Sequence, residues 1–447
     1  MDTLTAPATG VLPIHAITTG AHPLPDIKHP QSRERGYSAH LRRILLYSHD
    51  TYGLGHLRRN LAIAGHLLRT IDQLQVVLVS GSPVASRFSL PRGLQIVSLP
   101  PVVKVAPEAY NARDNEIGFG VVSRARAAII ADVARRFRPD VLLVDHAPLG
   151  MKGELLPTFE TLRRDVPGAR IVLGLRDVLD DPDDVRRAWD AEGILARIEQ
   201  VYDRILVYGS PDILDAASAY GIVGSARERV SYCGYISRVD ERPLAFPRPV
   251  APSGARYVLG TAGGGEDGFE ALLATVQAAT ALDLDALIVA GPLMHREGRE
   301  RLVADAAKAG GRVQVVDFVP DMDEAMAGAS AIVTMGGYNT LCEAVASGVP
   351  TVVIPRTWPR REQAIRARLF EERGLVRVVE PGDDLAGRLA PRLREALGDR
   401  RRLVPGIDLH GARRVREALL GEAAAAARQR ASVRGRASLA APSLATA

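Results

Sequence analysis

The sequence predicts an α/β protein built from two doubly wound domains that face each other across a cleft. Three observations support this: a length of 447 residues, two separate series of short aliphatic runs, and a proline-rich segment between the series. A chain of this length exceeds one ordinary domain. Continuous apolar runs suit strands buried on both faces of a parallel sheet, and the helical spacing between them suits crossover helices.

The first series of runs follows an arm, residues 1–40, which holds five prolines and no sustained periodicity, so we expect it to be disordered. Residues 41–235 are predicted to form the first domain. Its strands are expected at 43–48, 75–80, 94–98, 141–145, 170–174, 205–208 and 230–233.

The proline-rich residues 236–255 are predicted to be an interdomain linker. A second domain is predicted over 256–420. The strands of this domain are expected at 256–260, 286–290, 313–316, 331–334, 351–354 and 376–379. Residues 421–447 are rich in Ala, Arg and Ser, and we expect them to be a disordered tail.

Charge and composition exclude several classes of protein. The net charge of +5 lies at the two ends, with +2 in residues 1–43 and +3 in 421–447, so residues 44–420 sum to zero. A nucleic-acid surface on the folded part is therefore unsupported, while the basic ends leave open a peripheral contact with anionic membrane. The two cysteines, Cys233 and Cys342, fit a reduced cytoplasmic protein. We find neither a signal peptide nor an apolar run of the ~20 residues that span a bilayer.

Ligands of doubly wound domains bind where the strands end, so we searched there. After the run 256–260, Gly263, Gly265 and Gly268 match G-x-G-x-x-G. A dinucleotide site would need an acidic residue after the next strand, and none is present there. A glycine turn for tight packing is one alternative. The favoured interpretation is an anion site in which Gly264 and Gly265 let a phosphate approach the free N–H groups of a helix start.

A second loop follows the strand predicted at 331–334 and begins with Gly336 and Gly337. Asn339 and Thr340 are expected to cap the next helix. Glu343 is expected in its first turn, either as a partner of the helix dipole or as an acceptor for both hydroxyls of a ribose. Further on, Gln363 is predicted to bind sugar hydroxyls at another helix start, although a solvated helix start is the alternative.

The stretch YGLGHLRRN (52–60) places His56 directly after the first strand, at the start of a helix. A helix start disfavours imidazolium and lowers its pKa, so His56 is predicted to be a neutral general base. A histidine that caps the turn is the alternative. Asp145 ends the strand 141–145 and is predicted either to orient His56 or to contact an acceptor; a helix cap is its alternative.

On the acceptor side of the cleft we place Gly55, Arg58, His146 and Arg176, because all of them follow predicted strands. Arg58 and its neighbour Arg59 either neutralise an anionic substrate or face solvent. Three D-x-D matches, at 181–183, 283–285 and 321–323, are predicted to cap helices. We predict neither a metal ion nor another cofactor.

Taken together, these motifs resemble the GT-B glycosyltransferases, whose fold has two Rossmann-like domains. The resemblance is greatest to glycosyltransferase family 28, the group that contains the peptidoglycan N-acetylglucosaminyltransferase. It covers roughly residues 40–410, with its clearest motifs at 259–268, 317–343 and 348–374. The resemblance implies that the first glycine loop contacts phosphate, that Phe318 and Val319 flank the base, that Glu343 binds ribose and that Gln363 binds the donor hexose.

The expected function is an inverting, metal-independent glycosyltransferase. It would move a hexose from a nucleotide-diphospho-sugar, expected to be UDP-linked, to a hydroxyl of an acceptor that the sequence does not identify. Two alternatives stay open. The segment from Gly53 to Arg58 also resembles nucleotide-sugar hydrolases of the same fold, and a non-catalytic nucleotide-sugar-binding protein would carry the same donor motifs.

Overall fold

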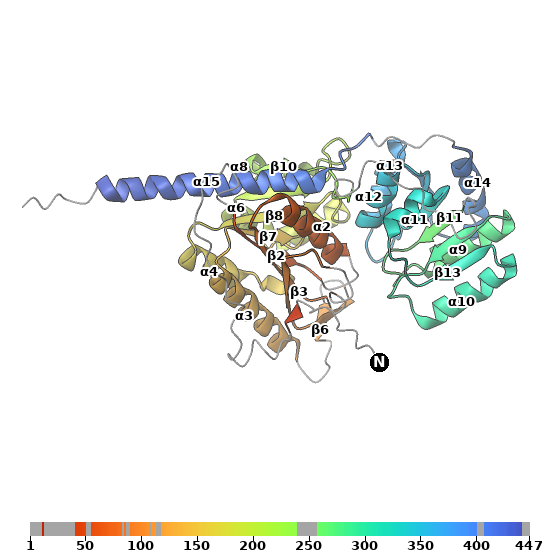
Figure 1. The fold of residues 1–447 in the computed structure, drawn as a ribbon, viewed down its shortest axis with the longest axis horizontal. Helices are drawn as coiled ribbons and strands as arrows, with labels where there is room; N and C mark the ends of the chain where they lie inside the picture. The colour runs from red at the N-terminus through yellow and green to blue at the C-terminus, as the bar shows by residue number, and fades with distance from the viewer. Residues whose placement is uncertain are drawn as a thin grey trace, which may run out of the picture.

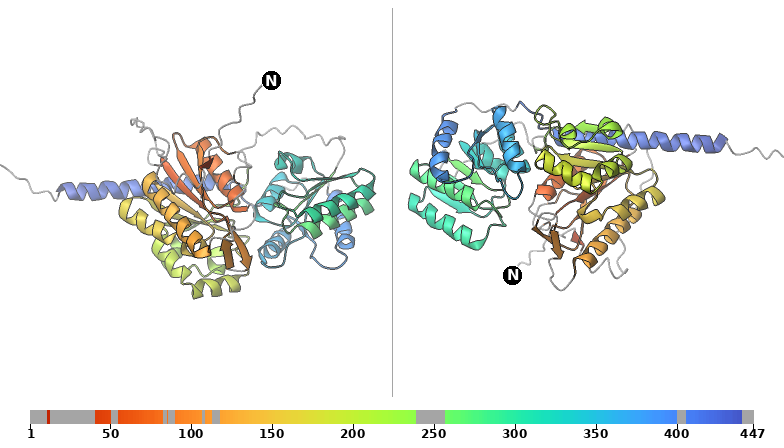
Figure 2. Two further views of the ribbon diagram at one scale, coloured as in Figure 1. Left: turned by 90° about the horizontal axis from the view of Figure 1, so that it is seen from below. Right: turned by 180° about the vertical axis from the view of Figure 1, so that it is seen from behind.

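The computed structural model describes residues 11–12, 41–50, 55–82, 85, 90–106, 109–112, 118–238, 257–399 and 406–439. Two sheet-based domains lie side by side, and Figures 1 and 2 show each as a sheet covered by helices. The predicted fold class is therefore confirmed. Most of the predicted arm, most of the linker and residues 440–447 lie outside the described residues.

The first domain contains an eight-stranded sheet in the order β1-β4-β3-β2-β7-β8-β9-β10, and every pair of neighbours is parallel. Its strands are β1 (Val11–Leu12), β2 (Arg43–Ser48), β3 (Gln75–Ser80), β4 (Leu94–Ser98), β7 (Val141–Asp145), β8 (Arg170–Arg176), β9 (Arg204–Tyr208) and β10 (Val230–Tyr232). Seven of these match predicted runs. β1 corrects the prediction that all of residues 1–40 are disordered, because it pairs with β4.

The apolar run of β2 is buried on both faces because successive side chains point to opposite sides of the sheet. Ile44 and Leu46 join one apolar core, and Leu45 and Tyr47 join the other. The helices that complete this domain are α2 (Gly55–Thr70), α3 (Phe119–Phe137), η3 (Met151–Gly153), α4 (Leu156–Asp165), α5 (Pro182–Ala191), α6 (Ile194–Val201), α7 (Ala216–Ala219) and α8 (Gly224–Glu228).

A small antiparallel hairpin, β5 (Val102–Ala106) with β6 (Ala109–Ala112), lies beside this domain and was not predicted. Its strands are short and carry mixed residues, so they lack the continuous apolar runs that identified the buried strands.

The second domain contains a six-stranded parallel sheet in the order β13-β12-β11-β14-β15-β16. Its strands are β11 (Val258–Thr261), β12 (Ala286–Val289), β13 (Val313–Val316), β14 (Ala331–Thr334), β15 (Thr351–Val353) and β16 (Arg377–Val378). The helices are α9 (Phe269–Ala281), α10 (Arg296–Ala306), η5 (Ala307–Ala309), α11 (Met322–Gly328), α12 (Tyr338–Ser347), α13 (Glu362–Glu372) and α14 (Leu385–Gly398).

Both sheets reverse their strand order at one point, which lies between β2 and β7 in the first domain and between β11 and β14 in the second. Crevices form at such points, outside the carboxyl ends of the strands. His56 and Asp145 follow or end the two strands at the first point, and the two glycine loops follow the strands at the second.

The last helix, α15 (Gly411–Leu439), corrects the predicted end of the second domain at residue 420 and the predicted disorder from 421. Figure 1 shows α15 lying along the first domain, where Val415 and Leu419 join the core shared with α2. Glu422 is buried and accepts hydrogen bonds from Arg170 and Arg204 at 3.1 and 2.9 Å. The alanine-rich composition suggested disorder, but buried alanines and this carboxylate hold the helix to β8 and β9.

The two domains also touch through Tyr235, whose ring stacks on Tyr338 with 6.0 Å between centroids. A buried ion pair joins Asp177 to Arg366 at 2.9 Å.

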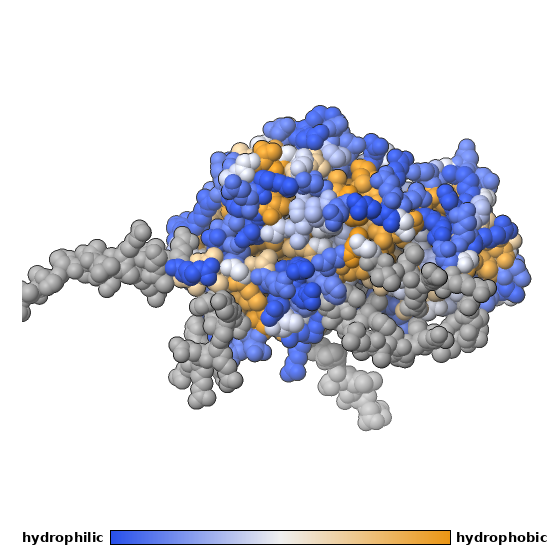
Figure 3. Space-filling model, turned by 90° about the horizontal axis from the view of Figure 1, so that it is seen from above, coloured by the Kyte–Doolittle hydropathy of each residue, from blue (hydrophilic) through white to orange (hydrophobic). Residues whose placement is uncertain are grey.

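Cys233 and Cys342 are both free and buried. In the face shown in Figure 3, polar residues surround separate apolar groups. Among the described helices, none combines the length and the hydropathy needed to cross a bilayer.

Candidate active site

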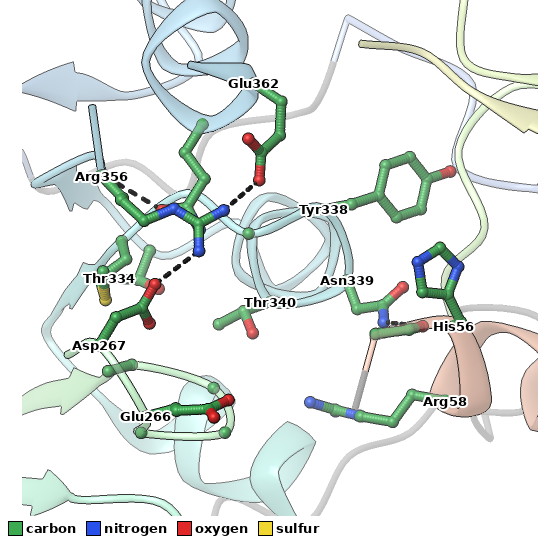
Figure 4. Close-up of a pocket in the computed structure, with 18 of the residues that line it drawn as sticks. His56, Arg58, Glu266, Asp267, Thr334, Tyr338, Asn339, Thr340, Arg356 and Glu362 are labelled. Carbon is green, nitrogen blue, oxygen red and sulfur yellow. Dashed lines mark hydrogen bonds and ion pairs between the residues drawn. The ribbon is translucent and has the colours of Figure 1, made fainter. Parts of the chain in front are cut away.

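A cavity lies between the domains, and residues from both line it (Figure 4). Gly55, His56, Arg58 and Arg59 enter from α2, and Arg176 enters from the end of β8. The second domain contributes the glycine loop after β11, the start of α12 and the start of α13. The cavity therefore lies at the ends of the strands, as predicted, and at the points where both sheets reverse their strand order.

His56 is held by Asp145. The His56 Nδ1 atom lies 2.6 Å from Asp145 Oδ2. Nδ1 also lies 3.0 Å from Arg59 Nη2, which can only donate, but its contact with the carboxylate is the shorter one. Because an ionised carboxylate can only accept, we assign the proton to Nδ1, which leaves Nε2 with a free lone pair. Of the two predicted roles of Asp145, the structure supports the one that orients His56.

Arg59 completes this group and is fully enclosed. Its guanidinium donates to both oxygens of Asp145, with the shortest contact at 2.7 Å, and lies over the rings of Tyr208 and Tyr338 at 5.7 and 5.5 Å. The sequence suggested either a substrate contact or a solvent-facing arginine. Arg59 is instead buried, and it neutralises the carboxylate that orients His56.

Burial is the largest effect on His56 and lowers its pKa to about 4; Arg59 adds to this effect and the Asp145 carboxylate opposes it. For Asp145, burial alone would raise the pKa, but Arg59 and the hydrogen bond from His56 lower it to about 2. The imidazole is therefore neutral at physiological pH, as predicted. The sequence attributed this to the helix start, whereas desolvation is the main cause.

Two further histidines surround His56. The ring of His146 lies 4.9 Å from that of His56, and the ring of His49 lies 5.9 Å from it, measured between centroids. Burial is the main reason that the pKa values of His49 and His146 fall well below the usual range. His49 had not been predicted in the site. Within the described residues, no group of three or more His, Cys, Asp or Glu side chains could hold a metal ion.

The glycine loop after β11 needs glycine at Gly265. Its φ angle is 89°, and a Cβ atom would lie 2.1 Å from the Ala290 carbonyl oxygen. Gly264, by contrast, would place a Cβ no closer than 3.4 Å to the side chain of Leu293. Both glycines line the cavity, so the loop exposes its backbone there, as the phosphate interpretation requires.

The start of α12 lies opposite His56. Gly337 precedes the helix, and the structure shows no side-chain cap there. Asn339 and Thr340 therefore do not cap the helix as predicted: the Asn339 amide instead donates to the Gly55 carbonyl oxygen of the first domain at 2.8 Å. Backbone N–H groups at this helix start remain available to an anion. Tyr338 points away from the cavity centre, and its hydroxyl accepts from Ile236 N–H at 3.0 Å.

Glu343 lies in the second turn of α12, not in the first as predicted, because the helix begins at Tyr338. Its carboxylate accepts from Arg58 Nη2 at 2.7 and 2.9 Å, across the domain boundary. Burial is the main effect that raises the pKa of Glu343, and Arg58 opposes it. Glu343 does not line the cavity itself, but its partner Arg58 does.

The start of α13 carries a set of interactions that the sequence missed. Arg356 pairs with Asp267 at 2.6 Å and with Glu362 at 2.5 Å, as Figure 4 shows. Gln363 accepts from the backbone N–H of Arg356 at 3.2 Å and lines the cavity. A basic residue at the end of the predicted strand 351–354 was the available signal. One oxygen of Glu362 is buried without a hydrogen-bond partner in the described residues.

Two predicted base-flanking residues are not at the cavity. Phe318 is 65% exposed, and neither Phe318 nor Val319 lines it.

The D-x-D predictions are confirmed for Asp181 and Asp321, which cap α5 and α11. The third is wrong: Asp283 lies in the turn between α9 and β12, where no helix begins.

Fold and site together define a two-domain protein of the GT-B type, in which a histidine faces an uncapped helix start across a cleft. Residues 263–406 match the model of the glycosyltransferase family 28 C-terminal domain. A UDP-N-acetylglucosamine--N-acetylmuramyl-(pentapeptide) pyrophosphoryl-undecaprenol N-acetylglucosamine transferase from Halorhodospira halophila is 31% identical over 285 residues, 62% of this chain and 70% of the relative. The chain belongs to glycosyltransferase family 28.

Other similarities are shorter or structural. A transferase of the same name from Haemophilus ducreyi is 31% identical over 107 residues, which cover 24% of this chain and only 30% of that relative. Among solved structures, MurG from Acinetobacter baumannii has a TM-score of 0.51 at 15% identity, covering 84% of this chain and 94% of MurG. The kitacinnamycin glycotransferase has a TM-score of 0.54 at 17% identity. The match covers 89% of this chain and 99% of the glycotransferase. These structural similarities show the shared GT-B fold.

Proposed function

We propose that this protein is an inverting glycosyltransferase that moves a hexose from a UDP-linked sugar to an acceptor hydroxyl. The single observation that carries the proposal is the position of His56. Its neutral imidazole is oriented by Asp145 and lines one cavity with the uncapped start of α12. A base on one side and an anion site on the other are what a displacement at a phosphorylated sugar requires.

In the proposed reaction, the acceptor oxygen bonds to the anomeric carbon while the bond from that carbon to the β-phosphate oxygen breaks. The bonding electron pair leaves with UDP, and the hydroxyl proton passes to Nε2 of His56. Asp145 stabilises the imidazolium that forms, and Arg59 keeps Asp145 ionised. Attack on the face opposite the leaving group inverts the anomeric centre.

The donor roles follow from the resemblance and from the cavity. The N–H groups around Gly264, Gly265, Gly336 and Gly337 bind the diphosphate without a metal ion. Glu343 binds the ribose, for which it must share or exchange its contact with Arg58. Gln363 binds the hexose, and Phe318 and Val319 flank the base. Because neither lies at the cavity, this last role requires the base to extend beyond it.

On the acceptor side, Gly55 and Arg58 line the cavity that the incoming hydroxyl would enter. His146 does not line it and would act through its contact with the ring of His56. The names of the relatives specify a pyrophosphoryl-undecaprenol acceptor, and we extend to this chain only a hydroxyl-bearing acceptor. We place the protein in the cytoplasm, and the basic residues at its two ends are its proposed contact with anionic membrane.

The proposal is tested by calorimetry with UDP-, GDP- and TDP-sugars, followed by incubation of the bound donor with and without hydroxyl acceptors. A transferase binds the donor and releases little free sugar until an acceptor is added. Rapid release of free sugar from the donor alone would instead identify a hydrolase. If His56→Ala retained all function while Glu343→Ala abolished it, the protein would be a non-catalytic nucleotide-sugar binder.

A further inference from the structure

Four arginines line the cavity, and three of them are already neutralised. Arg58 pairs with Glu343, Arg59 with Asp145, and Arg356 with both Asp267 and Glu362. Arg176 is different: it has no ion pair or side-chain hydrogen bond within the described part of the chain, and its Nε atom is buried without a partner. An unpaired, half-buried guanidinium in a ligand cavity, with its Nε atom fully buried, indicates that an anion completes it.

Arg176 is also held firmly in place. It is the last residue of β8, and the next residue, Asp177, forms the buried pair with Arg366 of the second domain at 2.9 Å. Arg366 in turn donates to the Gly336 carbonyl oxygen at 3.2 Å, directly before the start of α12. This chain of contacts ties the backbone beside Arg176 to the loop where the diphosphate is proposed to bind.

Arg176 lines the same cavity as His56 and as Glu362 and Gln363 at the start of α13. Its positive charge is one of the effects that lower the pKa of His56 and His146, and Glu362 at the start of α13 is the carboxylate that acts most strongly on it. Burial is the largest effect on Arg176 itself and lowers its pKa to about 10, so the guanidinium remains charged at neutral pH.

We infer that Arg176 is a further catalytic residue: it contacts the diphosphate of the sugar nucleotide and stabilises the charge on the departing UDP. This inference rests on the proposed function. It differs from the acceptor-side role predicted for Arg176 from the sequence. The first domain would thus supply a full positive charge to a leaving group that is otherwise bound by the second.

The chemistry of the transfer favours this role. As the bond to the anomeric carbon breaks, positive charge develops on the sugar and negative charge on the β-phosphate. A cation near the sugar opposes the reaction unless it is directed at the leaving oxygen. The helix start and glycine loop offer only partial charges, and Arg356, the second domain's own arginine in the cavity, is held by two carboxylates.

The test compares Arg176→Gln, Arg176→Lys and Arg176→Ala with the unaltered protein and with Arg164→Gln. Arg164 is an exposed arginine of the same domain that lies outside the cavity. Calorimetry measures the affinity for UDP and for UDP-N-acetylglucosamine, and a donor-only assay measures sugar release. Circular dichroism and the thermal midpoint establish that each variant is folded.

We expect Arg176→Gln to weaken UDP binding at least tenfold, to weaken UDP-sugar binding less, and to slow donor-only sugar release about a hundredfold. Arg176→Lys should retain part of the affinity for UDP and part of the rate of sugar release. Millimolar guanidinium should restore part of the rate of sugar release in Arg176→Ala. Unchanged UDP affinity combined with a raised KM for the acceptor would overturn the inference. If the unaltered protein bound no nucleotide, the proposed function itself would fail.

Discussion

Arg58 and Glu343 lie 285 residues apart in the sequence, yet they form an ion pair of 2.7 Å that joins the two domains across the cleft. The two side chains differ in their exposure to solvent: Glu343 is nearly enclosed, while Arg58 is 28% exposed. The carboxylate proposed to bind ribose is therefore already paired, desolvated and fixed in direction before any nucleotide arrives.

This pair gives the first prediction. Glu343→Ala should weaken UDP binding by about 10- to 100-fold, since it removes hydrogen bonds to a charged acceptor worth about 1.5–3 kcal/mol each. Calorimetry with UDP measures the loss. Glu395→Gln is a matched control, because its carboxylate pairs with Arg392 on the surface of α14 in the same domain. Equal affinity in Glu343→Ala and the control would remove Glu343 from the donor site.

The second prediction concerns His56. His56→Ala should lower kcat by about 10²- to 10⁴-fold, the usual contribution of a general base. The affinity for UDP should change little, because the nucleotide is proposed to bind the second domain. Steady-state kinetics and calorimetry on one preparation separate the two effects. A proportional fall in UDP affinity would show that His56 binds the donor rather than activating the acceptor.

The pH dependence follows from the lowered pKa of His56, about 4 in the folded protein. Only the neutral imidazole can accept a proton, so kcat/KM should be level from about pH 8 to pH 5 and should fall tenfold per unit below about pH 4. An imidazole with a normal pKa near 6.5 would instead lose activity below about pH 6.5. A rate profile across this range distinguishes the two cases.

The lowered pKa of His56 also makes the stability of the folded protein depend on pH. Between pH 6.5 and about 4 the unfolded chain binds a proton at His56 that the folded protein does not, so stability should fall as the pH falls through this window. The Asp145 carboxyl, whose pKa is lowered to about 2, acts in the same direction at lower pH. His49 and His146, whose pKa values are lowered in the same direction, contribute to the same slope, so His56→Gln should reduce the slope between pH 6.5 and 4 without abolishing it. An unchanged slope would contradict the assignment.

Much of this molecule could be predicted from sequence because its strands are short apolar runs buried on both faces. Their order along the chain, with helical spacing between them, fixed the fold class. His56 and the glycine loops were found for a related reason: strand ends converge on the crevice of a doubly wound sheet. Local patterns contain no information of this kind about the pairs Arg58–Glu343 and Arg59–Asp145, which are set by how distant segments pack.

The sequence predictions that the structure contradicts also have physical causes. Alanine dominates residues 421–428, which resembles the composition of a disordered tail, but small side chains are also what a helix needs to lie close against another layer. Ala423 and Ala426 are buried there. Similarly, Asn339 looked like a helix cap from its position, but the nearby carbonyl of Gly55, supplied by the other domain, is its actual partner.

The fourth prediction tests the glycine loop. Gly265→Ala places a methyl group against the Ala290 carbonyl oxygen and demands a φ of 89°, so both strain and collision oppose it. We expect a loss of about 1–3 kcal/mol in stability, as for other residues held in sparsely populated backbone conformations. Gly264→Ala is the control, because its methyl group makes only ordinary contacts. Thermal midpoints of the two variants should differ clearly, and similar values would contradict the loop geometry.

The last prediction concerns Asp145 and Arg59, which are both buried and neutralise each other. Asp145→Asn leaves the guanidinium without its counter-charge, and breaking such a pair typically costs about 3–5 kcal/mol. The remaining amide can also donate to Nδ1 of His56, which would move the imidazole proton to Nε2 and abolish the base. We therefore expect a lowered thermal midpoint together with a loss of kcat that exceeds the unfolded fraction. Asp165→Asn, whose partner Arg164 is exposed, should change neither. If Asp145→Asn lost stability but kept its kcat when folded, Asp145 would be a structural partner of Arg59 and would have no part in orienting the base.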